Sequence, residues 1–205
     1  MNILTDQLPT AIRVNERIYD VNSDFRDCLR IILAFEDPDL APLEKQLVLL
    51  ENLYTEPVAP GDTAKAIKEG VRFLDGGSDD AGEDCKKPRL YSFAKDAGLI
   101  FAAYQQTHKI DLQNTEYLHW WQFMTLFMDL GESTVFCSLV GLRKRVKSGK
   151  ASKEEKQIAR EMGDLFDVPE LDTRDLAEKE LERMFVDQVK AARKRKKKER
   201  DGTRV

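Results

Sequence analysis

Residues 117–130 read YLHWWQFMTLFMDL and hold both tryptophans of the chain, two of its ten phenylalanines and two of its five methionines. Ten of these fourteen residues are apolar. The four polar ones, His119, Gln122, Thr125 and Asp129, are spaced by three or four residues, so a helix would place them on one arc. The rest of its surface is apolar, which predicts a helix that other elements surround on most sides. We expect this stretch to form the centre of the core.

The length and the composition of the chain are those of an ordinary globular domain. A chain of 205 residues fits one domain, or one domain with a tail. Its 41% of hydrophobic residues suffices for a core, and its 34% of charged residues exceeds the roughly 25% typical of globular domains. No apolar run approaches the ~20 residues that span a bilayer, and the N-terminus MNILTDQLPT does not resemble a signal peptide. The three cysteines are unevenly spaced, which predicts reduced thiols and a cytosolic location.

The charge is distributed unevenly along the chain. Residues 190–205 carry nine Lys or Arg and two acids, which leaves residues 1–189 at −11 within a total of −4. We therefore expect one helical domain over 1–189 and a basic tail, disordered or a frayed helix, over 190–205. The candidate electrostatic residues of this tail are Arg193, Lys194, Arg195, Lys196, Lys197 and Lys198. They could end a solvated helix, contact an acidic surface, or bind phosphates, although no interleaved aromatics would stack on bases.

The first part of the chain predicts a hairpin and three helices. Residues 11–21 alternate apolar and polar around Asn15-Glu16, which is typical of a short β-hairpin. A helix should follow the cap candidates at 22–24, a second should begin at Pro42, and a third should run from about 62 to 74. Their expected apolar faces comprise, in order, Phe25, Cys28, Leu29, Ile32 and Phe35; Leu43, Leu47, Leu50 and Tyr54; and Ala66, Ile67, Val71 and Leu74.

The later part predicts further helices after a Gly-rich, acidic stretch at 76–88. This stretch is a linker between two lobes or a long loop projecting from one. Ser92 is expected to cap a helix with Asp96 complementing its dipole, and Thr115 to cap the Trp-rich helix. A helix over 133–146 ends in the basic run 143–145, and its apolar side comprises Val135, Phe136, Leu139, Leu142 and Val146. Ser152 begins a capping box for a helix to about 166, and a charged helix starts near 172. The fold class is therefore mainly α, with about seven to eight helices and a small N-terminal β-hairpin.

Few residues are candidates for chemistry. His119 is best explained as a hydrogen-bonded interior residue, with catalysis as the alternative, and His108 as a surface residue at a helix end. Cys28 and Cys137 suit packing, whereas Cys85 beside two lysines is the most reactive thiol. The sequence holds no phosphate-binding loop, no EF-hand spacing and no Cys/His cluster. We expect no catalytic, cofactor-binding or metal-binding residues, no cofactor, and no enzymatic activity.

The two adjacent tryptophans cannot form one aromatic platform, because consecutive helical side chains point about 100° apart. One is expected in the core, and the other against a neighbouring lobe or a partner chain. Tryptophans are enriched in interface anchors. The candidate partner-binding residues are Trp120, Trp121, Phe123 and Phe127.

Several segments together resemble a known family. They are SDFR at 23–26, YSFAKDAGLIFAAYQQTHKIDL at 91–112, LHWWQF at 118–123 and SKEEK at 152–156, after an N-terminal hairpin. The chain resembles the small proteins encoded in tail-morphogenesis modules of siphophages and prophages of Gram-positive bacteria, between the major tail protein and the tape-measure protein. They are described as tail-assembly-chaperone-like. The resemblance covers most of residues 8–185; the 76–88 stretch and the basic tail depart from it.

The resemblance implies a non-enzymatic factor of phage tail assembly in the cytoplasm of the bacterial host. Such a chaperone or adaptor would bind the tape-measure or tail-tube protein before the tail polymerises. An alternative is a structural component that stays in the virion tail, and a less favoured one is a nucleic-acid-binding regulator acting through the basic tail. Self-association remains open, and no membrane partner is expected.

Overall fold

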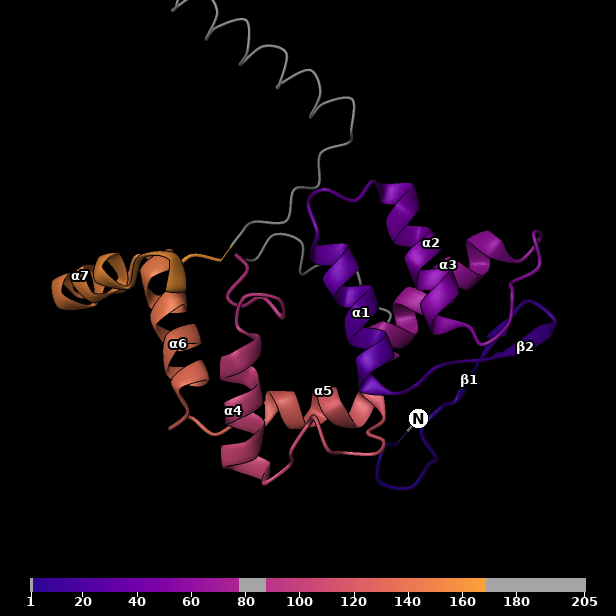
Figure 1. Ribbon diagram of the computed structural model, residues 1–205, viewed down its shortest axis with the longest axis horizontal. Helices are drawn as coiled ribbons and strands as arrows, with labels where there is room; N and C mark the ends of the chain where they lie inside the picture. Colours follow the sequence, from indigo (N-terminus) through magenta and orange to yellow (C-terminus); the bar gives the residue numbers. More distant parts are fainter. Residues whose placement is uncertain (1, 78–87, 169–205) are drawn as a thin grey trace, which may run out of the picture. The chain divides into compact units, whose positions relative to one another are not determined.

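The computed structural model describes residues 2–77 and 88–168, which lie in one compact unit, Met1–Leu171 (Figure 1). Most of the 76–88 stretch, Cys85, the helix expected from 172, the boundary at 189 and the basic tail lie outside the described residues. The described elements are β1 (Ala11–Val14), β2 (Arg17–Asp20), α1 (Phe25–Glu36), α2 (Pro42–Leu53), α3 (Thr63–Leu74), α4 (Ala97–His108), α5 (Trp120–Met128), α6 (Val135–Lys147), α7 (Lys153–Met162) and a 3-10 turn (Gly163–Leu165). These seven α-helices and the N-terminal hairpin confirm the predicted fold class. None of the described helices combines the length and the apolar character needed to cross a membrane.

The β1–β2 hairpin has the predicted two-residue turn. Val14 pairs with Arg17, so Asn15 and Glu16 form the turn, and Asn15 takes a φ of 53°, which asparagine tolerates better than most residues. The hairpin is held to the start of α3 by Asp62, whose carboxylate accepts hydrogen bonds from Asn15 Nδ2 at 2.7 Å and Tyr19 Oη at 2.8 Å. Packing on α3 supplies the apolar contact that an isolated hairpin lacks.

Helix α2 begins at Pro42 as expected, but only part of its expected apolar face packs on the core, where Tyr54 is buried and Leu50 half-buried. Leu43 and Leu47 are 66% and 48% exposed, whereas Leu49 and Leu53 are fully buried. Five leucines in this helix allow either orientation, and α3 decides between them. A Cβ on Gly70 of α3 would lie 2.8 Å from Leu49 Cδ2, so the missing side chain is what lets α3 approach this row of leucines closely.

Helices α1 and α5 start side by side, because two backbone segments pair before them. Trp120 N donates to Ser23 O at 2.7 Å, and Phe25 N donates to Leu118 O at 2.9 Å. This pairing keeps residue 118 extended, so the Trp-rich helix begins at Trp120 and Thr115 is not its cap. Of the cap candidates at 22–24, Asp24 caps α1, accepting from Arg26 N at 2.9 Å. The two helix starts are thereby fastened to each other.

The start of α4 differs from the prediction because of two acidic side chains, the half-buried Glu36 and the fully buried Asp96. Glu36, at the end of α1, accepts hydrogen bonds from Ser92 Oγ and from the backbone N–H of residue 93, so Ser92 serves a turn and α4 begins only at Ala97. Asp96 precedes the helix, but it does not face solvent. It is fully buried and forms an ion pair with Arg143 of α6. The sequence indicated only that Arg143 belongs to the basic run at the end of that helix.

Helix α6 is capped by Thr134, and α7 by the predicted capping box at Ser152. Val135 is exposed, contrary to the expected apolar face, while Phe136, Leu139 and Leu142 are buried as predicted. Helix α7 ends at Met162, earlier than expected, because Gly163 takes a positive φ and leads into the 3-10 turn.

Candidate functional site

Both tryptophans of α5 bind the end of α3. Trp120 Nε1 donates to Leu74 O and Trp121 Nε1 donates to Phe73 O, each at 2.8 Å. The rings diverge as predicted: Trp120 is buried in the core, while Trp121 is half-buried and packs on Phe73 with 5.7 Å between ring centroids. Trp121 also closes over Gly77, where a Cβ would lie 3.0 Å from its ring. The second tryptophan therefore meets a helix of the same compact unit.

Phe123 is the centre of an aromatic cluster. Its ring stacks on those of Phe25, Tyr104 and Trp120 at centroid distances of 5.0, 4.9 and 5.5 Å. Phe127 continues the cluster toward α6. Trp120, Phe123 and Phe127 are buried, and Trp121 is half-buried, so these four candidates present little surface in the folded chain. Their role in partner binding stays a prediction.

His119 is the N-cap of α5. Its Nδ1 accepts from Trp121 N at 3.0 Å, which requires that nitrogen to be unprotonated, so Nε2–H donates to Pro9 O at 3.0 Å. This buried, fully bonded ring agrees with the interior residue that we expected. His108 is half-buried, contrary to a surface placement, and its Nε2 lies 2.9 Å from Leu126 O of α5.

Acidification should weaken the fold through His119. Burial lowers the pKa of this imidazole, and the hydrogen bond to Pro9 opposes only part of that effect. A lowered folded-state pKa means that the unfolded chain takes up the proton first, so the stabilisation is complete above the ordinary His pKa of about 6.5 and is lost as the pH falls below it. We expect urea midpoints to drop more from pH 7 to pH 5 in the wild type than in His119→Asn, which can cap but does not titrate. Equal drops would contradict this assignment.

The remaining chemical candidates are structural where the chain is described. Cys28 is buried, with its Sγ 3.7 Å from Asn22 O, and burial raises the pKa of its thiol far above the usual range. Cys137 is half-buried in α6 with Sγ 3.3 Å from Leu130 O. Over residues 2–77 and 88–168, no cluster of three or more His, Cys, Asp or Glu could hold a metal ion.

An apolar groove of about 440 Å³ lies between α1 and α4. Leu29 and Leu33 of α1 line one side, Ala97, Gly98 and Phe101 of α4 line the other, and Phe123 of α5 contributes to its lining from the core. Leu33 is 39% exposed, and a Cβ on Gly98 would meet no atom within 4 Å. The groove is therefore open and apolar, and it is shallow on the α4 side because Ala97 and Gly98 are small.

The outer face of α4 is uncharged. Its twelve residues, AGLIFAAYQQTH, contain no Asp, Glu, Lys or Arg, although a third of the chain is charged. The exposed positions of this helix are Ala97, Gly98, Ala102, Gln105 and Gln106. A charged residue is the normal occupant of an exposed helix position, since it keeps the surface hydrated. This face can therefore be covered by a partner at little desolvation cost.

Reasoning from sequence did not single out the groove, the Glu36 contacts or the Arg143–Asp96 pair. For the groove, a signal was present: a glycine inside an uncharged helix segment costs about 1 kcal/mol relative to alanine and usually has a packing or functional reason. For the two acid groups, local sequence holds no such signal, because their partners come from distant elements.

Comparison with known proteins identifies the family. A family model described as "Bacteriophage Gp15 protein" matches residues 4–168, which include every described element from β1 to the 3-10 turn. No curated protein and no solved structure matches the chain. The match confirms the resemblance to phage proteins and points to a phage-related structural or morphogenesis role. The chain, with its buried aromatic cluster and its apolar groove, belongs to the bacteriophage Gp15 protein family.

Proposed function

We propose that this chain is a phage tail assembly factor, a non-enzymatic chaperone or adaptor that binds the tape-measure or tail-tube protein before the tail polymerises. The observation that carries the proposal is the open apolar groove between α1 and α4. An amphipathic helix of a partner can lay its apolar side chains into such a groove. The acidic body keeps the loaded factor soluble, because its net negative charge opposes self-association.

The uncharged outer face of α4 supports the same site. A partner helix lying over the groove would contact Ala97 and Gly98, where small residues permit close approach, and would meet Gln105 and Gln106 farther along. No charged group on α4 would have to be desolvated. The groove would therefore act as part of a hydrophobic core that is completed only when the partner binds, because the buried centre of an interface is packed like a protein interior.

Filling the groove should abolish binding without harming the fold. Gly98→Gln adds a side chain into open space at the groove, and glutamine is a better helix former than glycine by up to about 1 kcal/mol. We expect Gly98→Gln to bind the purified tape-measure or tail-tube protein of the same phage at least about tenfold more weakly, a loss of about 1.4 kcal/mol. Isothermal titration calorimetry measures the affinity, and urea denaturation confirms that stability is retained or raised.

The matched control is Gly61→Gln, the same substitution at an exposed glycine before α3, where a Cβ would also meet no atom within 4 Å and which lies outside the groove lining. It should bind as the wild type does. If Gly98→Gln also bound as the wild type does, the groove would not be the binding site. Mass spectrometry of purified virions distinguishes the alternative role: a stoichiometric amount in mature particles would indicate a structural component of the tail.

A further inference from the structure

The α6–α7 region carries a net positive charge, although the chain as a whole is negative. Residues 144–160 contain seven Lys or Arg and two Glu, a net charge of +5 in a chain whose total is −4. Arg145 is paired with Glu155 at 2.7 Å, and Lys147 Nζ donates to Arg89 O at 2.8 Å. Among residues 2–77 and 88–168, Lys156 and Arg160 form no ion pair with an acidic side chain. These two cations stand one helical turn apart on α7 and are available to a partner.

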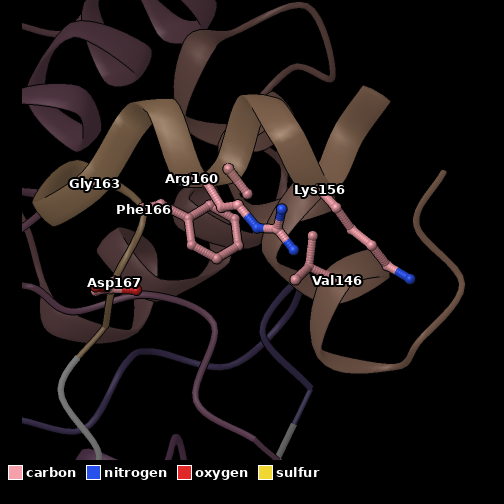
Figure 2. Close-up of a pocket in the computed structure, with 7 residues that line it drawn as sticks. Val146, Lys156, Arg160, Gly163, Phe166 and Asp167 are labelled. Atoms are coloured by element: carbon pink, nitrogen blue, oxygen red, sulfur yellow. The ribbon is translucent and has the colours of Figure 1, made fainter. Parts of the chain in front are cut away.

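A pocket of about 470 Å³ lies next to these two cations. Val146 of α6, Ala159 of α7 and Phe166 after the 3-10 turn supply its apolar lining. Figure 2 shows Lys156 and Arg160 extending from α7 on the side where Val146 lies, whereas Asp167 lies beyond the Phe166 ring. The pocket thus combines an apolar surface with a positive rim, and its one acidic group stands at the other end.

This combination selects among anionic ligands. Side chains at i and i+4 on a helix lie about 6 Å apart, so two carboxylates one turn apart on a second helix can face Lys156 and Arg160 together. The apolar lining needs a hydrophobic side chain to cover it, and a sugar–phosphate backbone has none. Nucleic acid is held mainly through rows of phosphate contacts and stacked bases. The chemistry of the pocket therefore favours a protein segment.

We propose that the pocket between α6 and α7 binds an acidic, amphipathic segment of a protein partner. One apolar side chain of that segment packs on Val146, Ala159 and Phe166, and neighbouring carboxylates pair with Lys156 and Arg160. This contact uses no residue of the groove between α1 and α4. It stands whether or not the groove binds a tail protein, and Gly98→Gln leaves it intact.

The test uses the full chain and a synthetic acidic amphipathic peptide as the probe. Calorimetry at low and physiological salt measures its binding to the wild type, to Lys156→Gln/Arg160→Gln and to Lys150→Gln/Lys153→Gln. The second pair removes the same charge from the same basic region but lies outside the pocket lining. We expect the pocket variant to bind at least about tenfold more weakly and the control variant to change less than about threefold. Circular dichroism confirms that both variants fold.

Two further probes decide what the pocket recognises. An analogue of the peptide with glutamine for glutamate, and one with serine for the apolar residues, should each bind much more weakly than the parent. Equal losses in the pocket and control variants would overturn the proposal, because binding would then follow net charge alone. A single-stranded DNA oligonucleotide that bound with the same sensitivity to Lys156 and Arg160, where the peptide did not, would also overturn it and assign the surface to nucleic acid.

Discussion

Replacing Arg143 with methionine is expected to lower the free energy of unfolding by about 3–5 kcal/mol, because it leaves the Asp96 carboxylate buried without its cation. Both side chains are fully buried, and the guanidinium faces the carboxylate with two bonds of 2.7 and 3.0 Å. This paired geometry is the arrangement that arginine forms best with a carboxylate. Urea denaturation followed by circular dichroism measures the loss.

The same guanidinium satisfies three backbone carbonyls. Arg143 donates to Leu90 O at 3.1 Å, to Leu165 O at 2.7 Å and to Phe166 O at 2.8 Å. Methionine would also leave these three carbonyls without a hydrogen-bond donor. The loss in free energy of unfolding should therefore exceed that of an ordinary core substitution. Adding Asp96→Asn should recover part of the stability, since a neutral amide leaves no buried charge and still accepts from Ser92 N.

Arg145→Met provides the control, two residues along the same helix. Arg145 is half-exposed and its pair with Glu155 faces solvent, so its loss should cost no more than about 1 kcal/mol. If Arg143→Met and Arg145→Met lost similar free energies of unfolding, the buried Arg143–Asp96 pair would contribute no more to stability than the exposed Arg145–Glu155 pair does.

Phe123→Ala should cost about 3–5 kcal/mol, the range for removing a buried phenylalanine. The ring stacks on three other aromatic rings contributed by α1, α4 and α5, so its removal leaves a cavity that rigid neighbours cannot close. The unfolding midpoint in urea and the near-ultraviolet circular dichroism of the aromatic cluster should both fall. Against a typical total stability of 5–15 kcal/mol, part of the population could unfold without denaturant.

Met128→Ala is the matched substitution at the end of the same helix. Met128 is 78% exposed, so its truncation should change stability by less than about 0.5 kcal/mol. A large loss at Met128, or a small one at Phe123, would contradict the burial that places the core around α5.

Local signals in the sequence were sufficient for much of the fold. Asp24, Pro42 and Ser152 begin helices because a side chain or a fixed φ satisfies the first turn, and these effects involve only near neighbours. The turn at Asn15 follows from two alternating segments that must pair. The apolar character of 117–130 located the core, since no other stretch combines so many large side chains.

The errors have a common origin in contacts between distant elements. Leu43 and Leu47 look equivalent to Leu49 and Leu53 in sequence, and only the close approach of Gly70 selects between them. Thr115 is a good cap, yet pairing of residue 118 with residue 25 keeps the chain extended past it. Arg143 reads as a helix-end cation until Asp96 is brought beside it. The groove was missed for the same reason, because its two walls belong to separate helices.

The two indole hydrogen bonds to the end of α3 give the chain an intrinsic fluorescence reporter. The indole N–H groups of Trp120 and Trp121 donate to consecutive backbone carbonyls at the end of α3. The emission wavelength of the two tryptophans therefore reports whether α3 is packed on α5. Trp120 should emit at short wavelength from its dry site, and half-buried Trp121 at longer wavelength. Detachment of α3 would shift both bands to the red. No label is needed to follow that event during refolding.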